Sequence, residues 1–200
     1  MMRSRSPRYH CIYIPGLGDS YDGLRRRGLA SWQLWGVSTE LIPMQWYGGG
    51  DFSQRYDAVV AAIDKAQLRG DRVVVVGESA GASMAINVVA HRPDVDGLVT
   101  VCGITNSQAE VSPLIRKKSP AFNEAISRLD SSLNMLNLTR VCSVRAVIDS
   151  VVPKHSSVIT GARQGVAWSV GHLFTITLCL SLYGGYVVYL IRTFKKEHSV

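Results

Sequence analysis

Short apolar runs bounded by turn residues alternate along the chain with segments whose apolar positions repeat at helical spacing. The apolar runs predict strands over residues 9–14, 38–44, 73–76, 98–102, 140–148 and 165–170. The helical segments are residues 29–35, 52–67, 82–90, 121–136, 156–162 and 173–191. Because strands and helices alternate, we predict an α/β fold, with a mostly parallel twisted sheet and helices on both of its faces.

The length of the chain fits one domain that buries a core without disulfides or metal. It has 200 residues and shows no internal repeat. The interval over residues 104–140, between two predicted strands, is short and carries the basic patch Arg116-Lys117-Lys118. We therefore expect residues 1–200 to form a single domain, with residues 104–140 as a minimal, lid-like insertion.

A serine stands between a predicted buried strand and a predicted helix. The run of valines over residues 73–76 leads directly into Gly77-Glu78-Ser79-Ala80-Gly81. Glycines two residues either side of Ser79 let a strand and a helix approach closely, and they tolerate the strained backbone of such a turn. An ordinary strand-to-helix turn needs neither the hydroxyl nor both glycines. The context therefore predicts that Ser79 is a nucleophile projecting above the end of the sheet.

A nucleophilic serine needs a base, and the chain offers five histidines. His10 precedes the first strand and His198 lies in a polar tail, so we expect both to be solvated. His91 ends the helix after Ser79, where a cation is favourable at the negative helix end. His172 follows the last strand, at the edge of a parallel sheet that also carries Ser79, and is our choice. His155, in a loop, stays an alternative.

The base needs a carboxylate to orient it, and Asp149 directly follows the predicted strand over residues 140–148. It therefore lies at the same sheet edge as Ser79. Asp130 falls within a predicted helix, and Asp94 and Asp96 lie in a turn at the opposite edge. Asp149 is therefore the best-placed acid; the alternative is a turn aspartate that bonds the backbone of residues 150–152.

The chain order Ser79, Asp149, His172 is that of the nucleophile, acid and histidine in α/β-hydrolases. The matching segments are VVVVGESAG around the serine, AVIDSVVP around the acid, VGH at the histidine and IYIPGLGD at the first strand. The chain resembles that superfamily over nearly its whole length, in a small form that almost lacks a cap.

The resemblance implies roles for individual residues. Ser79 would attack a carbonyl carbon, His172 would accept its proton, and Asp149 would hold the imidazole. The amide of Ala80 would receive the oxyanion, together with that of Leu17 or Gly18. It implies a serine hydrolase that cleaves carboxylic esters or thioesters, including lipid esters, through an acyl-enzyme and without a cofactor.

Charge and cysteine usage exclude some other classes of protein. The net charge of +7 is spread over separate clusters rather than one basic helix, so we expect no nucleic-acid partner. The four cysteines are far apart and none forms a metal-ligand pair, so we expect no metal site. The first ten residues are basic but contain no apolar stretch, which predicts a cytoplasmic protein rather than a secreted one.

The apolar segment 173–191 contains no charged residue and reaches the lower length limit for crossing a bilayer. Either it packs on the sheet as the last helix of the fold, or it brings the protein to a membrane surface. Two alternatives to an enzyme follow: a non-catalytic interaction module on a hydrolase scaffold, and a membrane-tethered adaptor. The sequence predicts no oligomeric state.

Overall fold

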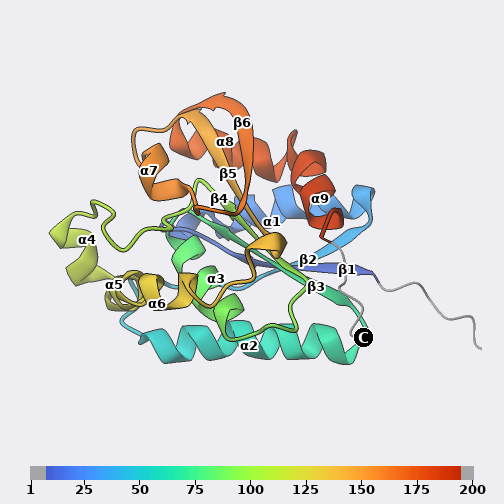
Figure 1. The fold of residues 1–200 in the computed structure, drawn as a ribbon, viewed down its shortest axis with the longest axis horizontal. Helices are drawn as coiled ribbons and strands as arrows, with labels where there is room; N and C mark the ends of the chain where they lie inside the picture. Colours follow the sequence, from blue (N-terminus) through green and yellow to red (C-terminus); the bar gives the residue numbers. More distant parts are fainter. Residues whose placement is uncertain (1–7, 195–200) are drawn as a thin grey trace, which may run out of the picture.

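A six-stranded sheet lies between two helical layers in the computed structural model, which describes residues 8–194 (Figure 1). The strand order is β2-β1-β3-β4-β5-β6, and every neighbouring pair is parallel. The strands are β1 (Tyr9–Ile14), β2 (Val37–Leu41), β3 (Arg72–Glu78), β4 (Gly97–Val101), β5 (Val141–Ile148) and β6 (Arg163–Val170). The α/β architecture predicted from the sequence is confirmed.

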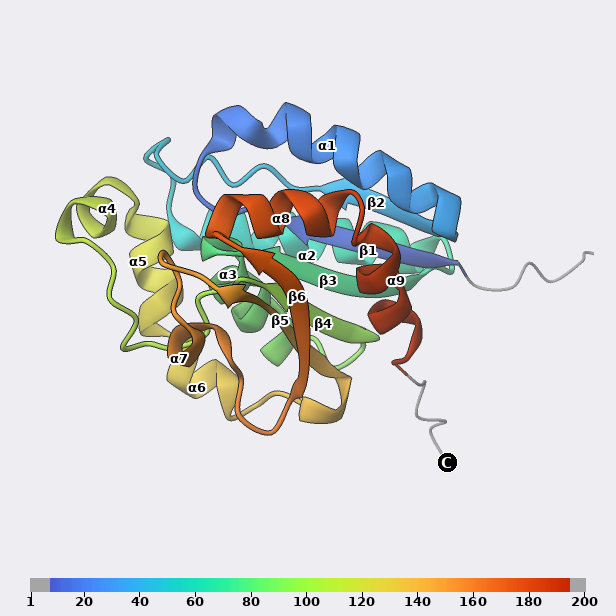
Figure 2. The same cartoon turned by 90° about the horizontal axis from the view of Figure 1, so that it is seen from above.

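Helices cover both faces of the sheet (Figures 1 and 2). One face carries α2 (Phe52–Leu68) and α3 (Ala80–Ala90), with α5 (Pro120–Ser127) and α6 (Leu129–Leu133) packed against α3. The other face carries α1 (Asp22–Ala30), α8 (His172–Leu180) and α9 (Gly184–Arg192). The short elements are α4 (Pro113–Lys118), α7 (Lys154–Ser157) and the 3-10 helices η1 (Asp19–Tyr21), η2 (Ser31–Trp35) and η3 (Leu138–Arg140).

The central strand β3 is buried on both of its faces, which explains its continuous run of valines. Val73 and Val75 pack into the core beneath α2 and α3. Val74 and Val76 point the other way, into the core beneath α1, α8 and α9. The alternation of side chains along a strand thus fills two cores from one apolar sequence.

The order in which strands are added to the sheet reverses between β1 and β3, which are parallel neighbours in the middle of the sheet: β2 follows on one side and β4 to β6 on the other. The chain leaves β1 toward α1 on one face and leaves β3 toward α3 on the other. Such a reversal opens a crevice at the carboxyl ends of the two strands, which is where open α/β sheets bind ligands. The loop that starts at Pro15 and the turn at Ser79 border this crevice.

The helix boundaries differ from the expected ones in four places. The helix expected over residues 156–162 is replaced by the short α7 (Lys154–Ser157), and residues 158–162 are not helical. The first helix begins at Asp22 rather than at residue 29, and residues 31–35 form the 3-10 helix η2. The helix expected over residues 121–136 is divided at Arg128 into α5 and α6. The single helix expected over residues 173–191 was wrong, because the chain breaks after Leu180 and resumes at Gly184, with the two axes bent by 68°.

Packing against η2 explains the break between α8 and α9. A Cβ atom on Gly184 would come within 2.7 Å of Trp32 Nε1, and one on Gly185 would come within 3.2 Å of Trp35. The start of α9 therefore lies directly on two tryptophan rings and follows their surface. Within residues 8–194 no single helix is long and apolar enough to cross a membrane, and only the bent pair α8–α9 meets that test by length and composition.

Candidate active site

Ser79 occupies a strained turn between β3 and α3. Its backbone has φ 48° and ψ −122°, a region that costs a non-glycine residue about 1–3 kcal/mol. A Cβ on Gly77 would lie 2.7 Å from Ala82 Cα, and one on Gly81 would lie 2.7 Å from the Pro15 carbonyl oxygen. Both flanking glycines are therefore required by the close approach of strand, helix and the loop after β1, as the sequence predicted.

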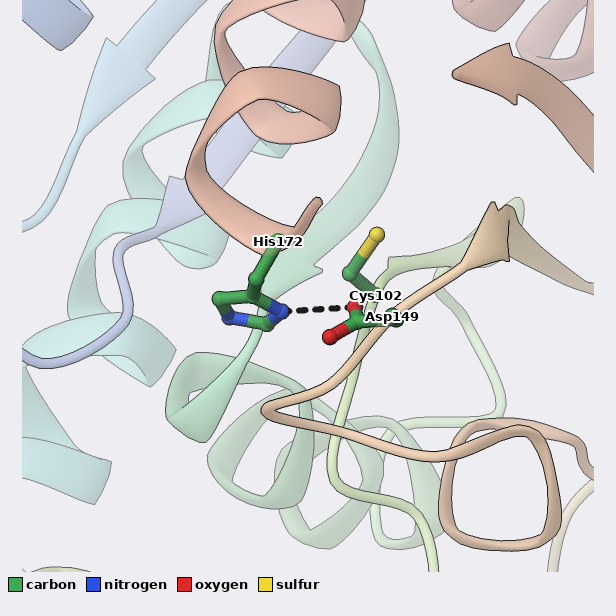
Figure 3. Close-up of side chains that lie close together, drawn as sticks. All are labelled: Cys102, Asp149 and His172. Atoms are coloured by element: carbon green, nitrogen blue, oxygen red, sulfur yellow. Dashed lines mark hydrogen bonds and ion pairs between the residues drawn. The ribbon is translucent and has the colours of Figure 1, made fainter. Parts of the chain in front are cut away.

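The structure brings Ser79, His172 and Asp149 together from three separate loops. The Ser79 Oγ lies 2.9 Å from His172 Nε2, and the His172 Nδ1 lies 2.7 Å from Asp149 Oδ2. Figure 3 shows the imidazole, at the first residue of α8, with one nitrogen directed at the carboxylate. His172 is buried, so the hydroxyl, imidazole and carboxylate form a continuous chain of hydrogen bonds largely screened from water.

Asp149 is fixed by the loop that follows β5. Its Oδ1 accepts hydrogen bonds from the amides of Val151 and Val152, each at 2.9 Å. Asp149 is thus both a turn aspartate and the partner of His172. Burial alone raises the pKa of Asp149, but the hydrogen bonds from His172 and from the two amides outweigh burial and leave its pKa below the usual value. The carboxylate is therefore held ionised.

The remaining histidines lie elsewhere. His10 was expected to be solvated, which is wrong: it is buried on β1 and its Nδ1 lies 2.7 Å from Ser38 Oγ. His91 follows the end of α3 and bonds the Asn87 carbonyl oxygen, in line with a structural role. His155 is exposed on α7, and His198 lies outside the described residues.

The other candidate acids have partners of their own. Asp130 accepts a hydrogen bond from Ser107, and Asp94 pairs with Arg92. Asp96 pairs with Arg72 near the start of β3. Of the four acids considered from the sequence, only Asp149 lies against a histidine.

The residues expected to meet an oxyanion lie beside Ser79. Ala80 is the first residue of α3, where helix N–H groups lack intrahelical acceptors and the helix dipole favours negative charge. Gly16 lies directly against Ser79, because a Cβ on Gly16 would come within 2.8 Å of Ser79 Cβ. Leu17 and Gly18 follow Gly16 in the same loop. Among the backbone hydrogen bonds of turns, loops and helix ends within residues 8–194, none is donated by the N–H of Leu17 or Ala80. Both amides are therefore free of such a partner.

A buried ion pair holds this loop, and the sequence analysis missed it. Glu78 is completely buried, and Arg25 on α1 donates to its Oε1 from Nε at 2.8 Å and from Nη2 at 2.5 Å. Glu78 also accepts hydrogen bonds from the Tyr13 hydroxyl and, at 3.0 Å, from the amide of Gly16. Arg25 in turn donates to the carbonyl oxygens of Leu17 and Gly18, so the ion pair ties the loop to β3.

The charges of this cluster are strongly coupled. Burial lowers the pKa of Arg25, but the adjacent Glu78 carboxylate outweighs burial and leaves the pKa raised. Burial and the same carboxylate raise the pKa of Tyr13 well above its usual value, so its hydroxyl stays a donor. The sequence does carry a signal for the cluster: a glutamate at the end of a fully buried strand requires a charged partner.

Cys102 is the third member of a group with Asp149 and His172 (Figure 3). One ligand atom from each lies within 4.8 Å of the others, the spacing of a potential metal site. The donor set does not suit a metal, because both His172 nitrogens and the Asp149 oxygens already have hydrogen-bond partners. In addition, burial and the charge of Asp149 raise the pKa of the Cys102 thiol, whereas metals bind the thiolate.

Comparison of the sequence with protein-family models and with curated proteins gives no match. The structure, in contrast, is similar to many solved structures. Human thioesterase 2 superposes with a TM-score of 0.65 at 14% identity, covering 95% of this chain and 99% of that one. Est1E from Butyrivibrio proteoclasticus gives a TM-score of 0.66 at 14% identity, covering 95% and 91%.

A putative hydrolase of the α/β superfamily from Xanthomonas campestris pv. campestris gives a TM-score of 0.61 at 20% identity, covering 90% of this chain and 98% of that one. These similarities extend over nearly the whole length of each protein. The chain has the α/β-hydrolase fold, as the motifs in its sequence predicted.

Proposed function

We propose that the protein is a serine hydrolase that cleaves carboxylic esters or thioesters through an acyl-enzyme on Ser79. The observation that carries the proposal is the hydrogen-bonded chain from Ser79 Oγ through His172 to Asp149. A hydroxyl is a weak nucleophile until a base takes its proton, and the base in turn needs a fixed orientation. Both requirements are met by side chains from loops after β5 and β6.

Each residue has a defined part in the proposed reaction. As the Ser79 oxygen bonds to the carbonyl carbon, its proton passes to His172 Nε2, and the carbonyl electron pair moves onto oxygen. When the oxyanion collapses, the bond to the leaving group breaks and His172 gives the proton to the departing oxygen or sulfur. Water then repeats the sequence on the acyl-enzyme and releases the acid. Asp149 stays ionised and stabilises the imidazolium that forms twice per cycle.

The oxyanion is stabilised by two backbone amides in this proposal, those of Ala80 and Leu17. Preorganised donors of this kind contribute about 3–4 kcal/mol each to transition-state stabilisation. The Leu17 amide belongs to a loop whose carbonyl groups accept hydrogen bonds from Arg25. The Arg25–Glu78 pair therefore positions the loop without touching the reacting carbonyl group.

The class of substrate follows from two supporting observations. Proteins with the same fold include a thioesterase and an esterase, as their names state. The interval 104–140 forms only the short helices α4, α5, α6 and η3, so it does not build a large cap over the crevice. Such an open site admits small ester or thioester substrates without movement of a lid.

Hydrolysis of p-nitrophenyl acetate by purified variants tests the proposal. We expect Ser79→Ala and His172→Ala to remove the protein-dependent rate, and Asp149→Asn to lower kcat by about 10⁴-fold. The matched control is His155→Ala, which removes the alternative, exposed histidine and should change the rate by less than about twofold. Thermal unfolding of each variant shows that the fold persists.

Retention of the rate in Ser79→Ala rejects Ser79 as the nucleophile. A folded wild-type protein that hydrolyses neither oxygen esters nor thioesters favours the alternative of a non-catalytic module on a hydrolase scaffold. Under that alternative the three side chains still bond one another but carry no reaction.

A further inference from the structure

An apolar groove of about 210 Å³ runs between α1 and α8. Figure 2 shows these two helices side by side on one face of the sheet, both starting at the same end. Apart from the ion pair in its floor, the lining is mostly hydrocarbon. The lining residues are Tyr21, Leu24, Gly28, Leu173, Ile176, Thr177, Leu180 and Ser181, with Arg25 and Glu78.

The groove is closed at one end and open at the other. A Cβ on Gly28 would lie 3.0 Å from Leu180 Cβ, so α1 and α8 are in direct contact there. Toward the start of the helices the walls are Leu24 and Leu173, both more than half exposed. The groove therefore opens at the carboxyl edge of the sheet, where α8 begins with His172, and ends at the Gly28–Leu180 contact.

Two of the lining residues are chain neighbours of the proposed catalytic residues. Glu78 immediately precedes Ser79, and Leu173 immediately follows His172. Arg25 in the floor donates a hydrogen bond to the carbonyl oxygen of Leu17. Leu17 is also the residue whose amide is proposed to bind the oxyanion. The open end thus lies at the carboxyl edge of the sheet, as do Ser79, His172 and the loop that contains Leu17.

The floor presents no uncompensated charge to an apolar ligand. The Arg25 and Glu78 side chains are bonded to each other at 2.5 Å, and each has further partners in the loop after β1. A paired, fully bonded floor under hydrocarbon walls is suited to an uncharged alkyl chain rather than to an anion or a sugar.

The other large cavities lack this relation to Ser79. A hollow of about 320 Å³ between α2, α3 and α6 is lined by Phe52, Asn87 and Arg128 on the opposite face of the sheet. A hollow of about 490 Å³ is lined by Tyr47 and the α4 residues Leu114, Ile115 and Lys118. Neither includes a chain neighbour of Ser79 or His172.

We propose that the α1–α8 groove binds a linear alkyl chain of the ester substrate, and that the Gly28–Leu180 contact limits the length of that chain. This inference rests on the proposed function, because it assigns a substrate class to the same site. The chain belongs either to the acyl group or to the alcohol. Burial of each methylene in the groove should raise kcat/KM roughly fourfold until the groove is full.

Two ester series identify which part of the substrate enters. In the first, p-nitrophenyl esters carry acetyl, butanoyl, hexanoyl, octanoyl and palmitoyl groups; in the second, acetate is esterified to linear alcohols of increasing length. We expect kcat/KM to rise along one series and then level off or fall for the longest chain. A flat dependence on chain length in both series overturns the proposal.

Substitutions that fill the groove provide a second test. Leu24→Trp places an indole on the α1 wall, and Thr177→Trp does so from the α8 wall; both positions are exposed, so the fold tolerates them. We expect each to lower the octanoyl-to-acetyl ratio of kcat/KM by about tenfold or more, equivalent to the loss of two buried methylenes. Leu34 is an exposed residue of η2 outside the groove. The matched control, Leu34→Trp, should therefore leave the octanoyl-to-acetyl ratio unchanged.

A binding measurement separates failure of this inference from failure of the proposed function. In Ser79→Ala protein, titration of 1-octanol should shift the methyl NMR signals of Ile176 and Leu180, and Leu24→Trp should remove the shift. These signals report binding even if the protein turns over no ester. Absence of the shift in Ser79→Ala protein, when the wild type hydrolyses p-nitrophenyl acetate, overturns the groove assignment and leaves the proposed function standing.

Discussion

The ion pair between Arg25 and Glu78 makes a quantitative prediction about stability. Substitution Arg25→Leu removes both hydrogen bonds from the guanidinium to Glu78 and leaves a completely buried carboxylate. Only the Tyr13 hydroxyl and the Gly16 amide remain as its partners. Because one charge then stays buried without its counterion, we expect the free energy of unfolding to fall by about 3–5 kcal/mol.

The double variant Arg25→Leu/Glu78→Gln isolates the cost of the uncompensated charge. A glutamine has the same shape and no charge: its Oε1 can accept from the Gly16 amide, and its Nε2 can donate to the Tyr13 hydroxyl oxygen. We therefore expect the double variant to recover about 2 kcal/mol of the loss. The surface pair Arg69–Asp71, with Arg69 43% exposed, is the control. Arg69→Leu should cost less than about 1 kcal/mol, because water screens that pair.

Urea unfolding followed by tryptophan fluorescence measures all three variants, with an unchanged m-value confirming that the native state is intact. For a chain of this size the loss in Arg25→Leu corresponds to a Tm lower by about 6–20 °C. The reasoning is refuted if Arg25→Leu costs no more than Arg69→Leu, or if the double variant is less stable than Arg25→Leu alone.

Three further predictions follow from the close contacts and the titrating groups. Gly81→Ala should lower the free energy of unfolding by at least about 2 kcal/mol and reduce ester turnover, because the new Cβ meets the carbonyl oxygens of Ile14 and Pro15. An unchanged free energy of unfolding in urea contradicts the packing described for the turn. The pKa of Asp149 is lower in the folded than in the unfolded protein. The ionised carboxylate therefore stabilises the fold above about pH 4, and this stabilisation is lost as the pH falls through the pKa of the folded state. In acid, the urea midpoint of Asp149→Asn should therefore depend less on pH than the urea midpoint of the wild type does. Burial raises the pKa of Cys142 to about 11 and that of Cys179 to about 12, and the other two thiols are buried as well. Ellman's reagent should therefore react with these cysteines only after the protein is unfolded, and a fast reaction with the folded protein would show that the core is open.

The sequence predicted that Ser79, Asp149 and His172 would lie together, because their meeting depends on topology. Ser79 and Asp149 directly follow strands, and His172 comes two residues after one; the apolar runs of these strands are easy to recognise. Parallel strands place their carboxyl ends at one edge, so three residues far apart in the chain meet there without any detailed knowledge of packing. The close approach of strand and helix at Ser79 was predicted from the two turn glycines, Gly77 and Gly81.

The features that the sequence did not predict depend on contacts between distant side chains. Arg25 had the pattern of a surface arginine, and only the path of α1 brings it to Glu78, 53 residues away. The break between α8 and α9 likewise depends on the surface of Trp32 and Trp35, about 150 residues earlier in the chain. Neither contact follows from local periodicity. Cytoplasmic localisation and contact with a membrane surface stay predictions from the sequence.

Covalent labelling tests the central claim most directly. Wild-type protein is treated with a fluorophosphonate, and the adduct is located by mass spectrometry of its peptides. We expect a single adduct on Ser79, formed much more slowly in His172→Ala because the hydroxyl then has no base. An adduct on another residue, or a Ser79 adduct that forms equally fast without His172, contradicts the account.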